Sequence, residues 1–385
     1  MSRIAQVATF LGISSVILGG IHYFIWARLF RDTVLPPLWT RAAGLALLAL
    51  AISIPMSFIL SRVLGRPLSA LSWVAFGWMG VFFLLLVGLA AGELVRGGVA
   101  LADFVRGVPV DPMRRQLLAR GLAGAASAFA VGAGLRGLYG VVRPVQVKQV
   151  EVALGDLPAA LDGFSIVAIS DVHLGPTIGP EFMRDVVARV NALQPDLIAI
   201  VGDLVDGSVE ELRESAAPLQ KLAARHGSFF VTGNHEYYSG AQEWLSHLRT
   251  LGLRTLENER VTIAEGFDLG GTNDLAGHGF RHGPDLDRVL AGRDGSRPLV
   301  LLAHQPKTFP EAAGKGVGLQ ISGHTHGGQI WPFGLLVRWQ QGFLAGLSRL
   351  GSSQLYVSRG TGYWGPPMRL GAPAEITRLV LRACA

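Results

Sequence analysis

The sequence predicts an α/β domain that is preceded by an all-helical transmembrane region, and three observations support this fold class. Long apolar stretches fill much of the first 144 residues. From about residue 145 onward, short β-branched runs alternate with stretches of helical pattern, which is typical of an α/β domain. Side chains that ligate metals follow several of these runs. We therefore expect a transmembrane anchor of three to four helices over residues 1–144 and an α/β domain over residues 145–385.

Three stretches of the anchor have the length and composition of membrane spans. They cover residues 5–26, 42–61 and 70–92, each close to the ~20 apolar residues that cross a bilayer. Aromatic residues such as Trp26, Trp39 and Trp73 lie near their ends, where amphipathic rings favour the headgroup zone. Burial of the same helices in a soluble bundle is the alternative. The mean hydropathy of +0.38 and the 16% of charged residues favour the membrane, because soluble domains carry about 25%.

A fourth stretch, residues 118–141, is weaker because it is rich in Ala and Gly and contains Arg136. If it spans, the number of crossings is even, and the C-terminal domain lies on the same side as the N-terminus. Arginines favour this arrangement, since basic loops face the cytoplasm. They gather in the first and third loops, at Arg28, Arg31, Arg41, Arg96, Arg106, Arg114, Arg115 and Arg120. We therefore expect a multi-pass protein of the inner or plasma membrane whose C-terminal domain is periplasmic or extracellular. The Arg114-Arg115 pair resembles a twin-arginine export signal, and an ordinary cytoplasmic span edge explains it equally well.

The basic charge does not point to nucleic acid. The whole chain has a formal net charge of +6, but residues 1–150 hold 14 Lys and Arg against 4 Asp and Glu. Residues 151–385 hold 20 basic and 24 acidic residues. The excess therefore belongs to the membrane half, where flanking arginines are expected, and a nucleic-acid partner is not needed to explain it.

The single cysteine, Cys384, excludes an intramolecular disulfide and a thiolate metal site. In the C-terminal domain, alternating apolar residues at Val145, Val147, Val150 and Val152 indicate an entry strand. Further strands are predicted at residues 165–170, 197–201, 228–232 and 298–303, with helices at 180–193 and 209–225.

Five clusters of polar residues carry the chemistry, and each follows a predicted strand or lies beside glycine. Side chains at the carboxyl ends of neighbouring strands can converge. A lone Asp after a strand is commonly a helix cap, and a lone His is commonly structural, so the conjunction is what matters. The clusters supply two Asp, one Asn and four His ligands. They are Asp171 with His173, Asp203, Asn234, His304, and His324 with His326.

The order and form of these clusters, ISDVHLG, VGDLVD, TGNHEYY, LAHQP and SGHTHGGQ, resemble the calcineurin-like metallophosphoesterase superfamily. The likeness extends over residues 160–380, and these forms, with YVSRGTG, are similar to its membrane-associated bacterial branch. The resemblance implies a four-layer α/β/β/α sandwich with metals at strand ends between two sheets. It says nothing about the N-terminal helices.

The resemblance also implies two divalent metal ions. One would be held by Asp171, His173, Asp203 and His326, and the other by Asp203, Asn234, His304 and His324. Two cations about 3.5–4 Å apart clamp a phosphate and lower the pKa of a bridging water, so that hydroxide attacks phosphorus. A ligand set of carboxylate, amide and imidazole without sulfur suits Mn, Fe or Zn.

His235 has a catalytic role in the family pattern, which is to stabilise the phosphoryl group and to protonate the leaving oxygen. Alternatively, His235 only orients the neighbouring ligand residues. Asp206 and Gln329 are candidates for hydrogen bonds to ligating groups, or they are turn residues. Arg359 could contact substrate phosphate or form a structural ion pair.

These residues imply hydrolysis of a phosphoester or pyrophosphate, and the membrane anchor favours a lipid or lipid-linked substrate. The segment WPFGLLVRWQQGFLAGL after the last motif could recruit such a lipid or form a buried helix. A nuclease or cyclic-nucleotide phosphodiesterase with the same metals is an alternative. A membrane sensor with a vestigial metal domain is another alternative. The intact ligand set argues against it, because a vestigial site would not need to keep its ligands.

Overall fold

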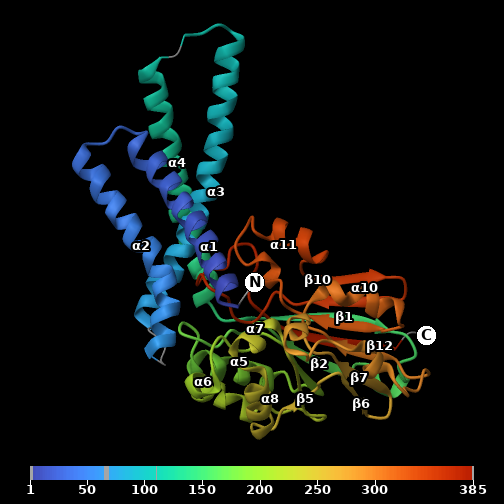
Figure 1. Cartoon of the computed structure of the whole chain (residues 1–385). Helices are drawn as coiled ribbons and strands as arrows, with labels where there is room; N and C mark the ends of the chain where they lie inside the picture. The colour runs from blue at the N-terminus through green and yellow to red at the C-terminus, as the bar shows by residue number, and fades with distance from the viewer. Residues whose placement is uncertain (1–2, 65–68, 110, 384–385) are drawn as a thin grey trace. The chain divides into compact units, whose positions relative to one another are not determined.

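The computed structural model describes residues 3–64, 69–109 and 111–383 (Figure 1). Cys384 lies outside this described part, so the structure does not test what was inferred from that residue. The chain divides into two compact units, Met1–Leu138 with Gly365–Pro367, and Tyr139–Trp364 with Met368–Ala385. The first is helical and the second is an α/β structure.

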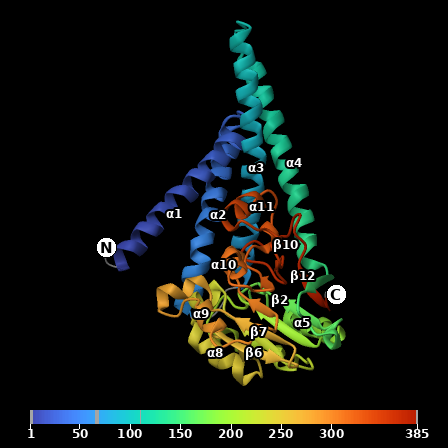
Figure 2. The ribbon, with the colours of Figure 1, turned by 90° about the vertical axis from the view of Figure 1, so that its right-hand side faces the viewer.

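The helical unit is built from α1 (Arg3–Trp26), α2 (Pro37–Leu64), α3 (Ser69–Val105) and α4 (Pro112–Val142). A π-helical turn, η1 (Ala27–Arg31), follows α1 directly. Four helices in the described part, including the one that contains residues 118–141, are long and apolar enough to cross a membrane. The helices α3 and α4 are longer than the predicted spans and extend beyond the connection between α1 and α2 (Figures 1 and 2).

Small residues allow α3 and α4 to approach closely. A Cβ atom on Gly88 would lie 3.2 Å from the Cα atom of Ala126, and one on Gly92 would lie 3.7 Å from the Cβ atom of Leu122. Glycines four residues apart create the flat surface that membrane helices commonly use for packing. The contact therefore depends on the backbone coming close at these two glycines.

The first sheet of the α/β unit has the order β1-β12-β2-β3-β4-β5. The strands β2 through β5 are parallel, β12 is antiparallel to β2, and β1 is parallel to β12. They span β1 (Gln146–Leu154), β2 (Ser165–Ile169), β3 (Leu197–Val201), β4 (Ser228–Val231), β5 (Arg254–Thr255) and β12 (Glu375–Ala383). The predicted strands at 165–170, 197–201 and 228–232 are thus confirmed as β2, β3 and β4 to within one residue.

The second sheet has the order β10-β11-β9-β8-β7-β6. Its four central strands are parallel, and both edge strands are antiparallel to their neighbours. They span β6 (Glu259–Ile263), β7 (Phe267–Gly271), β8 (Leu299–Leu302), β9 (Leu319–Ser322), β10 (Gly346–Leu350) and β11 (Ser353–Val357). The run predicted at 298–303 is β8.

Three apolar layers hold the sheets and helices together. The middle layer lies between the sheets, where Ala168 and Leu379 of the first sheet pack in one cluster with Phe267 and Tyr356 of the second. The helices α5 (Pro180–Ala192), α6 (Val209–Ala216) and α8 (Ala241–Thr250) cover the outer face of the first sheet. The helices α9 (Leu286–Leu290) and α10 (Phe309–Gly314) cover the second. The predicted four-layer α/β/β/α sandwich is confirmed.

Two predicted segments differ in detail. The helix expected over 209–225 ends at Ala216 and continues as a 3-10 turn, η3 (Ala217–Lys221), because Pro218 lacks the amide proton for the next helical hydrogen bond. The apolar segment after the last motif forms α11 (Gly334–Gln341). Its alternative interpretation as a buried helix is wrong, since Leu335 is 71% exposed and Trp339 is 81% exposed.

Candidate metal centre

The polar clusters predicted from the sequence all follow strand ends of the two central sheets. In the first sheet β2, β3 and β4 are parallel neighbours, and in the second β8 and β9 are parallel neighbours. The carboxyl ends of parallel strands meet at one edge of a sheet. The clusters follow β2 (Asp171, His173), β3 (Asp203, Asp206), β4 (Asn234, His235), β8 (His304) and β9 (His324, His326).

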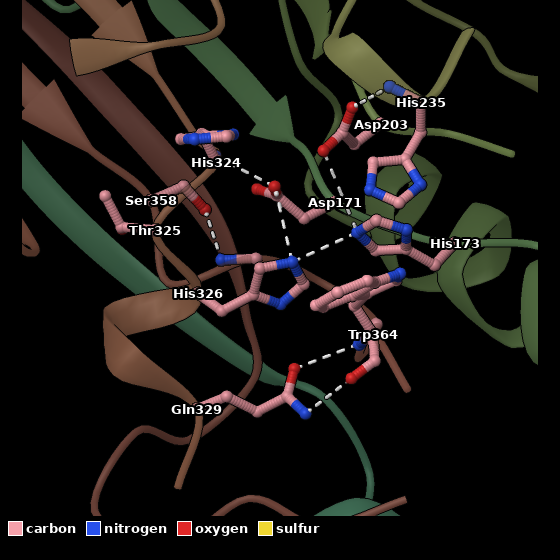
Figure 3. Close-up of polar contacts among 12 residues, drawn as sticks. Asp171, His173, Asp203, His235, His324, Thr325, His326, Gln329, Ser358 and Trp364 are labelled. Atoms are coloured by element: carbon pink, nitrogen blue, oxygen red, sulfur yellow. Dashed lines mark hydrogen bonds and ion pairs between the residues drawn. The ribbon is translucent and has the colours of Figure 1, made fainter. Parts of the chain in front are cut away.

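The structure brings one group of three potential ligands together from both sheets. Asp171, His173 and His326 each offer an atom within 4.8 Å of the others. The two Nε2 atoms of His173 and His326 lie 3.0 Å apart, and Asp171 Oδ1 lies 3.6 Å from His326 Nε2. Figure 3 shows these three side chains pointing toward one another.

A second group combines Asp203, His304 and His324, again with ligand atoms within 4.8 Å of one another. Asp203 Oδ2 lies 3.0 Å from His304 Nε2 and 4.0 Å from His173 Nε2. One carboxylate oxygen therefore faces an imidazole of each group, which is the position a bridging ligand requires.

Strained backbone accompanies this convergence. Asp171 (φ 52°), His173 (φ 54°), Asp203 (φ 51°), His324 (φ 70°) and His326 (φ 50°) all adopt the left-handed conformation. Residues other than glycine seldom do so, and such strain clusters at functional sites. Five of the seven predicted ligands share it, so the loops are shaped to direct these side chains inward.

Glycine is required where two of these loops touch. A Cβ atom on Gly233 would collide with the carboxylate and the amide nitrogen of Asp203. Gly202 has φ +72°, and a Cβ atom there would lie 2.7 Å from His304 Nδ1. The motifs therefore need glycine for close approach of loop to loop.

Buried polar atoms without hydrogen bonds test whether the residues fit metal ions. Among the described residues, Asp171 Oδ2 and Asn234 Oδ1 are buried and have no hydrogen-bond partner. Burying such atoms unpaired is costly. Both belong to predicted ligands, and their lone pairs suit a cation. The residues present therefore fit divalent metals.

Two histidines are held in the tautomer that a ligand needs. His304 Nδ1 donates to the Val201 carbonyl at 2.8 Å, and His173 Nδ1 donates to Asp206 Oδ1 at 2.9 Å. In neutral imidazole this leaves Nε2 with its lone pair directed at the carboxylates. Such hydrogen bonds to the non-ligating nitrogen are the usual support of metal-bound histidine.

The pKa values of the carboxylates in the two groups are shifted in opposite directions. Burial raises the pKa of Asp171, and the nearby His304 only partly offsets this. Burial also acts to raise the pKa of Asp203, but the charge and hydrogen bond of His304 outweigh it and hold that pKa well below the usual range. Asp203 is therefore ionised near neutral pH.

His235 lies beside the two groups and is tied to Asp206. Its Nδ1 atom donates to Asp206 Oδ1 at 2.6 Å, and its backbone amide donates to Asp203 Oδ1 at 2.9 Å. Burial acts to lower the pKa of His235, but the Asp206 hydrogen bond and the charge of Asp203 raise it to about 9. The imidazole is thus protonated near neutral pH and can donate a proton.

Two aromatic side chains frame His235. The rings of Tyr238 and Trp364 meet its imidazole edge-on at 5.5 and 5.6 Å, and both side chains are more than half exposed. Gln329 bonds to the main chain of Trp364 through both ends of its amide, at 2.9 Å each (Figure 3). Gln329 therefore positions the aromatic wall that flanks the candidate acid.

Two important residues were missed by the sequence reasoning. Glu236 is fully buried, and its carboxylate accepts the backbone amides of Gly233, Asp203 and Leu204. Burial raises its pKa to about 7. Its position three residues after Gly233 is the spacing of a capping box, which was the available signal.

Arg369 is the second residue to which the sequence assigned no role. It is 2% exposed and donates to the carbonyls of Gly362, Arg359 and Ala372. Its guanidinium also lies 3.3 Å from His326 Nδ1. Arg359, for which the sequence left open a phosphate contact or a structural ion pair, lies 3.4 Å from the buried Glu375, which is the ion-pair alternative.

Comparison with known proteins identifies the family to which these motifs belong. The model of the calcineurin-like phosphoesterase family matches residues 164–328. A transmembrane protein with metallophosphoesterase domain from Danio rerio is 36% identical over 329 residues, which cover 81% of this chain and 74% of that protein. An uncharacterized metallophosphoesterase from Bacillus subtilis is 32% identical over 286 residues, covering 70% of this chain and 98% of its own. The superfamily predicted from the motifs is confirmed.

Similarity to solved structures is weaker. A dimetal phosphatase from Danio rerio shares 15% identity with a TM-score of 0.38, over 52% of this chain and 88% of its own. A likeness at this level carries no argument about this chain.

Proposed function

The chain belongs to the calcineurin-like phosphoesterase family and is a phosphoester hydrolase, and we propose that it hydrolyses its substrate with two divalent ions held between the two sheets. The supporting observation is the position of Asp203 Oδ2, which faces an imidazole of each ligand group at 3.0 and 4.0 Å. The buried, unpaired oxygens of Asp171 and Asn234 also support it.

Seven residues would hold the ions. We assign Asp171, His173 and His326 to one ion, Asn234, His304 and His324 to the other, and Asp203 to both. When bound, the pair supplies Lewis-acid polarisation of the phosphate and a hydroxide nucleophile near neutral pH. Mn, Fe or Zn suits this mixed oxygen and nitrogen set.

His235 would act on the leaving group. Its Nδ1 atom is occupied by Asp206 at 2.6 Å, so Nε2 is the nitrogen that can donate a proton to the leaving oxygen. Asp206 accepts from both His173 and His235, and it would therefore fix the acid relative to a ligand.

The substrate class that the surface favours is a lipid or lipid-linked phosphoester or pyrophosphate. Beside the loop with His324 and His326, α11 and its entry segment expose Trp331 (57%), Phe333 (46%), Leu335 (71%), Leu336 (53%) and Trp339 (81%). Adjacent exposed aromatic and aliphatic side chains favour contact with a bilayer interface. We name these five residues the apolar platform.

The apolar platform is in direct contact with the loop that carries His324 and His326. Thr325 Oγ1 donates to the Leu344 carbonyl at 2.6 Å, and the backbone of Gly328 lies directly against that of Gly334. Movement of α11 against a lipid surface would therefore reach His324 and His326.

The α/β unit is also tethered closely to the membrane anchor. Helix α4 ends at Val142 and β1 begins at Gln146, and these residues can be separated by at most about 14 Å. Val141 packs against the core of the α/β unit. This short connection favours a substrate at the bilayer surface.

Hydrolysis by the detergent-solubilised full chain tests the chemistry. Bis(p-nitrophenyl) phosphate and p-nitrophenyl phosphate would be assayed after chelation and after addition of Mn. We expect release that depends on metal and is lost in Asp203→Asn and His235→Asn. The surface variants Asp287→Asn, whose side chain is 81% exposed, and His278→Asn serve as matched controls. A folded, metal-loaded chain that releases nothing from these compounds or from lipid phosphoesters would refute the proposal and favour the sensor interpretation.

The lipid preference needs a separate test on reconstituted chain. Leu336→Ser together with Trp339→Ser should reduce hydrolysis of a lipid phosphoester in vesicles by about tenfold or more, because roughly two apolar anchors are lost. The rate on bis(p-nitrophenyl) phosphate should stay unchanged. Val147→Ser, at a residue that is 45% exposed on β1, is the control. Equal loss on both substrates would assign the platform to folding instead.

We propose further that the protein crosses the inner or plasma membrane four times, with the α/β unit outside the cytoplasm. The four long apolar helices support an even number of crossings, and the arginine-rich loops support a cytoplasmic location for the other side. Alkaline phosphatase fused after residue 385 should be active and green fluorescent protein dark. The reverse pattern would place the unit in the cytoplasm.

A further inference from the structure

A layer of charged residues crosses the helical unit at one level. Arg28 lies 2.5 Å from Asp32 and 2.9 Å from Glu93, and Arg96 lies 3.6 Å from Asp32 and 3.5 Å from Glu93. Arg120 Nε donates to the Thr33 carbonyl at 3.0 Å. Because charges of membrane proteins gather at the headgroup level, this layer marks one boundary of the bilayer.

The helices α3 and α4 continue past that layer. From Arg96 to Val105, α3 runs about 14 Å further at 1.5 Å per residue, and both helices project beyond the α1–α2 connection in two views (Figures 1 and 2). Below the layer the helices touch at Gly88 and Gly92. Above it they border an open cavity of about 440 Å³, within the ~300–1,000 Å³ range of ligand sites.

The cavity is lined by the stripes that helix packing would normally bury. On α3 the lining residues recur at intervals of three and four, as Arg96, Val99, Ala100, Asp103 and Phe104. On α4 the same spacing gives Asp111, Arg114, Arg115 and Leu118. Such facing stripes pack against each other in an ordinary helix pair. Here they stay apart and leave a space between the helices. Because both apolar and arginine side chains line this space, it suits a ligand that is partly apolar and partly anionic.

The charges indicate the ligand's headgroup. Arg114 is neutralised by Asp103, with both carboxylate oxygens at 3.0 Å, and Asp111 caps α4 through the Met113 amide at 2.9 Å. Within the described residues no ion pair is found for Arg115, and Arg96 has only the two longer contacts given above. The guanidinium of Arg115 is thus available to a phosphate, and Arg96 is a second group that would exchange its two longer ion pairs for one. Both lie beside the apolar wall of Val99, Ala100 and Leu118.

We propose that this hairpin cavity binds the headgroup of an anionic phospholipid, whose acyl chains run back along α3 and α4 into the bilayer. The site is separate from the metal centre and does not depend on the reaction proposed there. Basic pockets between membrane helices on the cytoplasmic side bind anionic head groups.

Native mass spectrometry of the full chain in mild detergent tests the proposal. Dioleoylphosphatidylglycerol, dioleoylphosphatidylcholine and inorganic phosphate would be titrated separately. We expect tight binding of one phosphatidylglycerol, with much weaker binding of the other two. The double variant Arg96→Gln and Arg115→Gln should bind phosphatidylglycerol roughly 30-fold more weakly, and the control Arg106→Gln should bind normally, because Arg106 does not line the cavity.

A space-filling variant keeps the test independent of charge. Ala100→Trp should occupy the cavity and abolish phosphatidylglycerol binding, whereas Leu101→Trp, at a neighbouring position that is 64% exposed, should not. Equal binding of the two lipids, or unchanged binding in Ala100→Trp, would overturn the proposal. Equal binding of inorganic phosphate would overturn the lipid assignment. A dimer in light scattering that Ala100→Trp dissolves would assign the cavity to a second copy instead.

Discussion

The two sheets of the α/β unit contribute differently to the candidate metal centre. The first sheet supplies every carboxylate and the amide, together with His173 and His235, whereas the second supplies only imidazoles, from His304, His324 and His326. Each ligand group nevertheless combines both sheets, since Asp171 meets His326 and Asp203 meets His304. On the proposed assignment each ion takes ligands from both sheets, so the apolar layer between the sheets would fix the geometry of the site.

The largest expected effect comes from removing the carboxylate that joins the two groups. Asp203→Asn should reduce metal-dependent hydrolysis to the rate of the chelated chain, because the amide leaves both groups without their shared anion. His304→Ala, the partner from the second sheet at 3.0 Å, should do the same. The assay is release of p-nitrophenol. Substantial activity in either variant would show that one sheet suffices.

Removing the proton donor should have the next largest effect. His235→Asn should lower kcat by about 10²–10⁴-fold, the usual contribution of general acid catalysis, while metal content stays at the wild-type level. His278→Asn is the control. If His235→Asn lost metal along with activity, its imidazole would belong to the ligand set.

The layer between the sheets can be tested by its own energetics. Phe267 is fully buried there, and Phe267→Ala should cost about 3–5 kcal/mol of unfolding free energy. Denaturant unfolding with far-ultraviolet circular dichroism measures this loss. We also expect weaker metal binding, because the second sheet would no longer be held against the first. Undiminished metal affinity in a destabilised variant would contradict the claim that sheet packing sets the site.

Asp206 offers the smallest change and a pH readout. In the metal-free chain the pKa of His235 is raised from its usual 6.5 to about 9, so its contribution to stability is complete below pH 6.5 and is lost as pH rises through 9. Asp206→Asn removes the hydrogen bond that helps raise this pKa and should shift the imidazole titration downward. Histidine proton resonances against pH would measure it, and an unchanged titration would remove Asp206 from that role.

Much of the fold could be predicted because local signals agreed with the final structure. The strands β2, β3, β4 and β8 are continuous β-branched or apolar runs, as expected for strands that are buried on both faces. The convergence of Asp171, Asp203 and His304 followed from their positions after such strands. The four-layer arrangement came from the family resemblance and not from periodicity.

Other features depend on tertiary contacts that no local pattern shows. The apolar composition of α11 was compatible with a buried helix, and only its exposure of Trp339 at 81% decided the question. Arg359 could have faced a phosphate, but Glu375, 16 residues away, lies 3.4 Å from it. The extension of α3 beyond residue 92 was missed because its apolar residues continue past Glu93 and Arg96, where a membrane span would be expected to end.

Metal stoichiometry tests the central claim most directly. Full-length chain would be stripped with chelator, reloaded with Mn, desalted and measured by inductively coupled plasma mass spectrometry, alongside Asp203→Asn, His235→Asn and Asp287→Asn. We predict two ions per chain for the wild type, His235→Asn and Asp287→Asn, and fewer than two for Asp203→Asn. Two ions retained by Asp203→Asn, or fewer than two in the wild type, would contradict a centre in which both sheets share one bridging carboxylate.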